Sequence, residues 1–166
     1  KQQTTGPANF DQWYNDTEGV NRRVELPLSL LSKKKGDAHG CTSAESCFVY
    51  DSDENDPKGF FPLDGLGYAD VAPDDLKVPH NFFFTTEIHM EFAYAGGETF
   101  TFSGDDDVWV FINERLAIDL GGLHPRREGS VALDEAAARL AITVGKPYMR
   151  LSTTYQSEIP DVAELG

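Results

Sequence analysis

Residues 100–113 read Phe-Thr-Phe-Ser-Gly-Asp-Asp-Asp-Val-Trp-Val-Phe-Ile-Asn, and this stretch decides the fold class. Its first half alternates apolar and polar residues, which is typical of a half-buried antiparallel strand. Its second half, Val108–Ile112, is apolar on both faces, so we expect a central strand with Trp109 and Phe111 in the core, in preference to the alternative that these two residues form a sugar-stacking platform. Three aspartates join the two halves. The stretch therefore predicts two strands connected by an acidic turn.

The flanking sequence continues the strand pattern. Residues 82–94 alternate large apolar side chains with Thr, Glu and His, and they form the clearest further strand. Weaker patterns predict strands at 23–31, 116–118, 131–133 and 148–155. They also predict a short amphipathic turn or helix at 10–17 and a short helix at 135–141 with Asp134 as its N-cap. Many short strands separated by turn residues predict an all-β, antiparallel sandwich with one or two short helices.

Length and charge limit the possible partners. The chain has 166 residues, with 28 acidic and 14 basic side chains and a formal net charge of −14. This length fits a single domain over residues 1–166. Binding to a phosphate backbone or to anionic lipid requires a basic surface, so we expect no nucleic-acid partner and no such membrane docking. No apolar run approaches the roughly 20 residues that span a bilayer, so we expect no direct membrane insertion.

The two cysteines, Cys41 and Cys47, lie in the polar stretch Gly-Cys-Thr-Ser-Ala-Glu-Ser-Cys. This spacing suits a small disulfide-closed loop, although two unrelated thiols remain an alternative. A zinc site is less favoured, because no second Cys/His pair at finger spacing follows. A disulfide implies an oxidising compartment, so we expect a secreted or cell-surface protein.

The strongest candidate site is the run of three carboxylates, Asp105, Asp106 and Asp107. Like charges this close repel one another unless a cation lies between them. Calcium suits such a turn, because it takes about 6–8 oxygen ligands in irregular geometry. A solvated acidic turn explains the same residues without a metal. The residues by themselves leave both interpretations open.

Five segments together resemble the fibro-slime domain, a branch of the protective-antigen (PA-fourteen) β-sandwich superfamily. The resemblance covers roughly residues 8–148. It implies a jelly-roll-type β-sandwich. The segments that carry it are Phe60–Gly65, His80–Phe82, Phe84–His89, Phe100–Asn113 and Ile118–His124. The superfamily includes yeast flocculins and bacterial adhesins that bind sugars through calcium. The resemblance therefore implies an adhesion module whose partners are glycans on a cell surface or matrix.

In those lectins two adjacent aspartates, joined by a cis peptide bond, hold the calcium ion. The match of the following strand places this pair on Asp105 and Asp106. Asp107 is a third candidate metal ligand, and facing the glycan or water are its alternatives. A cis bond at a non-proline residue costs about 3 kcal/mol, which bound calcium can offset. The predicted glycan site comprises Asp105 and Asp106 together with Asp119 and His124. His124 follows Gly121-Gly122, a glycine pair that permits close approach of a ligand, and a structural loop histidine is an equal alternative.

The chain departs from the family pattern at three places. Asn113-Glu114 stands where Asn-Gly is usual, and since Glu resists positive φ we expect a turn other than type I′. A basic insertion, Pro125-Arg126-Arg127, follows His124. Residues 152–166 match poorly, so Gln156, Glu158 and Asp161 are only candidates for completing a calcium site.

Other candidate sites are weaker. Asp51, Asp53 and Asn55 resemble the start of a calcium loop without its later ligands, and Glu87, His89 and Glu91 could face a zinc ion but fit a polar strand face better. No nucleophile, phosphate-loop or dinucleotide motif occurs, so we do not expect an enzyme. The alternative to a lectin is a structural matrix or surface-assembly module that binds neighbouring proteins and uses calcium only to stabilise a loop.

Overall fold

The computed structural model describes residues 7–38, 40–41, 44–52, 59–66, 79–122, 124–145, 147–148 and 154–158. The chain divides into two compact units, one formed by residues 1–88 with 153–166 and the other by residues 89–152. Every strand pair within a sheet is antiparallel, and the described residues include two short helices. The prediction of an all-β fold with few short helices is therefore confirmed.

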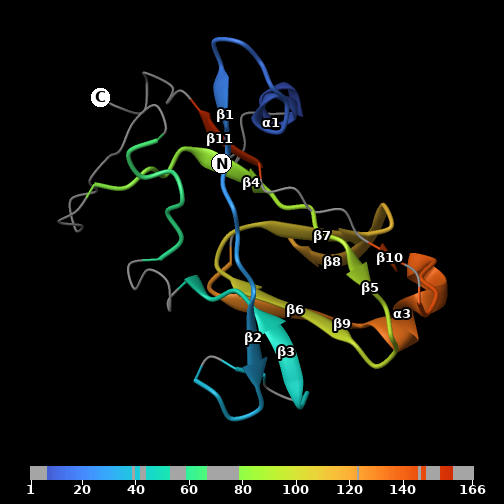
Figure 1. Ribbon diagram of the computed structural model, residues 1–166. Coiled ribbons are helices and arrows are strands. Elements are labelled where there is room, and N and C mark those ends of the chain that lie inside the picture. The colour runs from blue at the N-terminus through green and yellow to red at the C-terminus, as the bar shows by residue number, and fades with distance from the viewer. Residues whose placement is uncertain are drawn as a thin grey trace. The chain divides into compact units, whose positions relative to one another are not determined.

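The described residues of the first unit form one helix and two small sheets, which can be followed in Figure 1. Its elements are α1 (Pro7–Trp13), β1 (Asn21–Glu25), β2 (Leu31–Lys34), β3 (Ser46–Val49), β4 (Phe84–Glu87) and β11 (Thr154–Glu158). β11 lies between β1 and β4 in a three-stranded sheet, while β2 pairs with β3. The predicted strand at 23–31 is thus wrong as a single element. Pro27 lies between β1 and β2, because it has no N–H to give to a ladder.

A disulfide links the connection between β2 and β3 to β3 itself. Cys41 and Cys47 are bonded to each other, as their spacing predicted. β2 and β3 form an antiparallel hairpin around this disulfide, with Leu31 opposite Val49 and Ser32 opposite Phe48. A disulfide fits an extracellular protein. No helix in the described part of the chain has the length and apolar character needed to cross a membrane.

Among its described residues the second unit has three two-stranded ribbons and a helix. Its elements are β5 (Phe92–Ala93), β6 (Thr99–Gly104), β7 (Val108–Ile112), β8 (Arg115–Leu120), β9 (Arg127–Ala132), α3 (Leu133–Leu140) and β10 (Pro147–Tyr148). β6 pairs with β9, β7 with β8, and β5 with β10. Figure 1 shows the β7–β8 and β6–β9 ribbons as separate layers, with α3 following β9.

The inward faces of these ribbons form one apolar core with α3. Its buried members are Tyr94, Val110, Ile112, Ile118, Val131, Leu133, Ala136, Leu140 and Ile142. Ile112, Leu133 and Leu140 are almost fully buried. Burial of such side chains contributes roughly 1.5–3 kcal/mol each relative to exposure. The core thus fixes which face of β7 and β8 points away from it.

The predicted continuous strand at 82–94 is wrong. It is divided into β4 and β5, which belong to different units and pair with different partners, β11 and β10. Alternation reports which face a side chain takes, but it carries no information about which strand lies alongside. The two halves can therefore share a pattern without forming one strand.

The turn between β7 and β8 also differs from expectation. Asn113 (φ 50°) and Glu114 (φ 62°) both have positive φ, and Ile112 pairs with Arg115 across the turn. This is the type I′ arrangement that Glu was expected to resist. The Asn113 side chain offers a compensation, because its Nδ2 donates to the carbonyls of Leu140 (3.2 Å) and Ala141 (2.9 Å). The turn thereby satisfies carbonyls at the C-terminus of α3.

The predicted N-cap of α3, Asp134, is wrong. The N-cap is Ala132, without a side-chain cap bond, and Asp134 lies in the first turn. The Asp134 carboxylate instead accepts the Gly97 N–H at 2.8 Å and the hydroxyl of Tyr94. Asp134 therefore ties the helix to the chain before β6. This bond crosses 37 residues of sequence, which local capping rules do not address.

Candidate ligand-binding site

The acidic turn between β6 and β7 is exposed. Asp105, Asp106 and Asp107 all reach solvent, and the Asp107 N–H donates to Oδ1 of Asp106 at 2.8 Å. The bond between Asp105 and Asp106 is trans, so the expected cis peptide is wrong for this structure. The hydrogen bond between Asp106 and the Asp107 N–H stabilises the turn, in which all three carboxylates face solvent.

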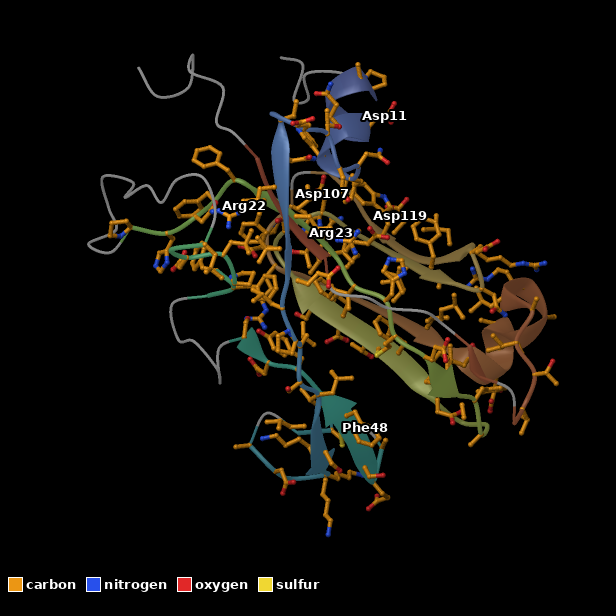
Figure 2. All side chains as sticks on the ribbon, turned by 45° about the horizontal axis from the view of Figure 1, so that its top comes forward. Asp11, Arg22, Arg23, Phe48, Asp107 and Asp119 are labelled. Carbon is orange, nitrogen blue, oxygen red and sulfur yellow. A yellow bond between two sulfur atoms is a disulfide. The ribbon has the colours of Figure 1, made fainter. Side chains whose placement is uncertain are left out.

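The pairing of β7 with β8 brings Asp119 to this turn. Val108, which follows Asp107, lies opposite Leu120, and Trp109 lies directly opposite Asp119. Figure 2 labels Asp107 and Asp119 on this ribbon. Oδ1 of Asp119 accepts the Gly121 N–H at 3.0 Å, which fixes the carboxylate. Two predicted site segments, separated by the whole hairpin in sequence, therefore share one end of the ribbon.

His124 lies in the connection that follows β8, and its ring is held by backbone. Nε2 is 2.7 Å from the Leu120 carbonyl and Nδ1 is 2.9 Å from the Pro125 carbonyl. These carbonyls, Leu120 first, raise the pKa of His124, and Asp107 raises it further while Arg127 opposes the shift. Donation to both carbonyls requires a protonated ring. His124 thus links the backbone at Leu120 to the backbone at Pro125. Its ring also interacts electrostatically with Asp107.

The basic insertion after His124 lies beside the acidic turn. Nε of Arg126 donates to Oγ of Ser103 at 3.2 Å, and Arg127 pairs with Gly104 at the end of β6. The residues contacted, Ser103 and Gly104, are the two that precede Asp105 in the sequence. The insertion therefore places positive charge next to the three carboxylates in an otherwise acidic chain.

The described residues contain no cluster of three or more His, Cys, Asp or Glu side chains arranged to hold a metal. Asp105, Asp106 and Asp107 could each supply oxygen, the donor type that calcium prefers. Gln156 and Glu158 lie in β11, where only the backbone is described, and Asp161, Asp53 and Asn55 fall outside the described residues. Calcium binding at this turn stays a prediction.

The aromatic residues of β7 correct the sequence analysis. Trp109 is 37% exposed and Phe111 is 53% exposed, so they do not pack in the core as expected. Val110 and Ile112 take the buried face instead. The apolar core packs against the face of β7 that carries Val110 and Ile112, and the opposite face, which carries Trp109 and Phe111, is open to solvent. An apolar run predicted burial on both faces, but the ribbon has a covering layer on one.

A buried polar cluster in the first unit had no assigned role in the sequence analysis. His80 and Asn81 are 4% and 0% exposed, and the Asp64 carboxylate contacts both, with Oδ2 2.5 Å from Nδ1 of His80 and Oδ1 2.8 Å from the Asn81 N–H. Phe61 stacks on His80 with ring centroids 4.0 Å apart. Two family-like segments, Phe60–Gly65 and His80–Phe82, therefore form one structural unit. Buried polar groups with satisfied hydrogen bonds fix a fold, and this cluster explains those segments.

The β2–β3 hairpin of the first unit exposes apolar residues. Phe48, labelled in Figure 2, is 74% exposed, and Leu31 on the facing strand is 44% exposed. Three lysines, Lys33 to Lys35, follow Leu31. Phe48 lies opposite Ser32 and Leu31 lies opposite Val49, so Phe48 and Leu31 are on opposite faces of the hairpin.

Comparison with known proteins finds no matching family model and no matching solved structure. The chain is similar to three proteins of Dictyostelium discoideum: it is 38% identical to Protein psiQ over 150 residues, 39% identical to Protein psiC over 144 residues and 40% identical to Protein psiD over 144 residues. The alignments cover 85–86% of this chain but 14% of psiQ and 25% each of psiC and psiD. The chain thus spans a quarter or less of the length of these relatives. The resemblance to the fibro-slime domain stays a prediction.

Proposed function

We propose that this chain is a carbohydrate-binding adhesion module of a secreted or cell-surface protein. Its glycan site would lie where the β6–β7 turn meets the end of β8. The observation that carries the proposal is the gathering of Asp107, Asp119 and His124 at this end, through the β7–β8 register and the charge interaction between Asp107 and His124. Exposed carboxylates accept strong hydrogen bonds from sugar hydroxyls. The role assigned is binding, without catalysis.

Calcium at Asp105 and Asp106 is the second part of the proposal, and it comes from the family resemblance. Three carboxylates in one exposed turn support it, because a divalent cation would relieve their mutual repulsion. Asp107 would complete the protein's contribution from this turn. Bound calcium would supply open coordination positions for vicinal hydroxyl groups of a glycan.

A glycan array probed with and without calcium tests both parts. We expect binding that a chelator abolishes, together with calcium binding by calorimetry. Asp106→Asn is the sharp variant, because Asn keeps the oxygen that accepts the Asp107 N–H while it removes the charge. It should weaken calcium binding and leave the far-UV spectrum unchanged. Asp11→Asn makes the same charge change at an exposed position on α1 and should have no effect.

The alternative function is a structural matrix or surface-assembly module. The observation that supports it is Phe48, which is 74% exposed on β3 beside the disulfide-bonded Cys47. A broad array that stays blank while calcium still binds would select this alternative. If the wild-type protein does not bind calcium, the proposed calcium site is overturned for both functions.

A further inference from the structure

We propose that Trp109 is the stacking surface on which a pyranose ring lies, with Asp119 as the hydrogen-bond acceptor at its edge. The inference rests on the proposed function and assigns its first contact residue outside the acidic turn. Trp109 and Asp119 are directly opposite each other in the β7–β8 ladder. Side chains that oppose each other across an antiparallel pair share a face, with Cβ atoms about 4.5–5.5 Å apart. Both point away from the core, and both are exposed.

The indole of Trp109 is held by the backbone of the following turn. A Cβ built on Gly121 would lie 2.8 Å from Cζ2 and 3.1 Å from both Cε2 and Nε1 of Trp109. Only a residue without a side chain allows this approach. The same Gly121 donates its N–H to Asp119. One glycine therefore positions the ring by its missing Cβ and the carboxylate by its N–H.

This pair matches the chemistry of a sugar. A pyranose ring has a flat face of C–H groups, which the electron-rich face of an indole attracts, and a rim of hydroxyl groups, which donate hydrogen bonds. A carboxylate can accept about four hydrogen bonds, so Asp119 keeps acceptor capacity beyond the Gly121 bond. A purely apolar partner would leave the carboxylate desolvated, which is costly. The pairing of ring and carboxylate therefore favours a carbohydrate over an apolar protein surface.

Phe111 offers a matched comparison on the same face. It is more exposed than Trp109, but the residue opposite it is Leu116, so it has no facing carboxylate. Two residues along a strand are about 7 Å apart. One sugar ring on Trp109 is therefore too small to depend on Phe111 as well. If the site works by ring and carboxylate together, the two aromatic residues should differ sharply in their effect.

The experiment measures affinity for the smallest glycan that wild-type protein binds on an array. We expect Trp109→Ala to weaken binding about tenfold, the order of a lost aromatic contact, and Trp109→Phe to weaken it about threefold. Gly121→Ala should also weaken binding, since it displaces the ring without removing a contact group. Phe111→Ala should leave affinity within about twofold. Thermal unfolding of each variant identifies any that fails to fold, and Trp109→Phe then decides in place of Trp109→Ala.

The outcomes separate this inference from the proposed function. Unchanged glycan affinity in folded Trp109 variants overturns the stacking role, while the proposed function stands. Equal loss in Trp109→Ala and Phe111→Ala also overturns it, because that result describes a general apolar surface such as a protein interface. A wild-type protein that binds no glycan overturns both.

Discussion

The positive φ of Glu114 gives a prediction whose sign is fixed by the backbone. Left-handed φ costs a residue with a Cβ about 1–2 kcal/mol, whereas Gly pays none of this but loses about 0.5–1 kcal/mol more conformational entropy on folding. Glu114 is exposed, so its side chain contributes little packing. Glu114→Gly should therefore raise the free energy of unfolding by roughly 0.5–1 kcal/mol.

The neighbouring position provides an opposite control. Asn113 also has positive φ, but Asn tolerates this conformation well and its Nδ2 donates to two carbonyls at the end of α3. Asn113→Gly gains little backbone relief and loses both bonds. It should lower the free energy of unfolding by roughly 1 kcal/mol.

Urea unfolding followed by tryptophan fluorescence measures both effects in the second unit. Trp13 lies in the first unit and Trp109 in the second, so a Trp13→Phe background makes the signal specific for the unit that contains the turn. Changes of the same sign in the two variants would refute the reasoning. So would a loss of stability in Glu114→Gly, since the turn would then not be strained as its φ angles imply.

Three further predictions concern the disulfide and the titratable groups. Replacing Cys41 and Cys47 by Ser should cost about 2 kcal/mol of unfolding free energy, the entropy of a loop with sequence separation 6, and reductant should make wild type match the variant in urea melts. The Gly97 N–H and then the Tyr94 hydroxyl lower the pKa of Asp134, while Asp134 raises the pKa of Tyr94 to about 12. The stabilisation by the Asp134–Tyr94 hydrogen bond should be lost as pH falls through the lowered pKa of Asp134 and as pH rises from about 10 through 12. In Asp134→Asn, the free energy of unfolding measured against pH should show neither of these two decreases. The Leu120 and Pro125 carbonyls raise the pKa of His124 above 6.5, so the stabilisation by His124 is present below pH 6.5 and is lost as pH rises through the folded pKa. NMR titration of the imidazole should give a pKa above 6.5, and a pKa below 6.5 would contradict the hydrogen bonds from the ring to both carbonyls.

Local pattern was sufficient where it depended on neighbouring residues. Alternation identified β6, and the run after the aspartates identified β7, because strand periodicity is a property of the chain itself. The spacing of Cys41 and Cys47 predicted their disulfide for the same reason. The acidic turn was found because carboxylates between two apolar strands must remain outside the core.

Pattern was insufficient where a second segment decides the outcome. The Asp64 bonds to His80 and Asn81 span 16 and 17 residues, and nothing near either segment announces the other. The type I′ turn was missed because the bonds from Asn113 to the end of α3 lie outside any local turn rule. Residues 82–94 were read as one strand because alternation does not name a partner.

The sequence by itself determined that this protein is an all-β chain with an exposed acidic turn between two strands and a small disulfide-closed loop. The tertiary structure decided which face of β7 is buried. Apolar residues on both sides of a strand can be covered only if a layer exists on each side, and here the core lies against Val110 and Ile112. Trp109 is consequently left on the outer face, opposite Asp119 and over Gly121, where it can meet a ligand.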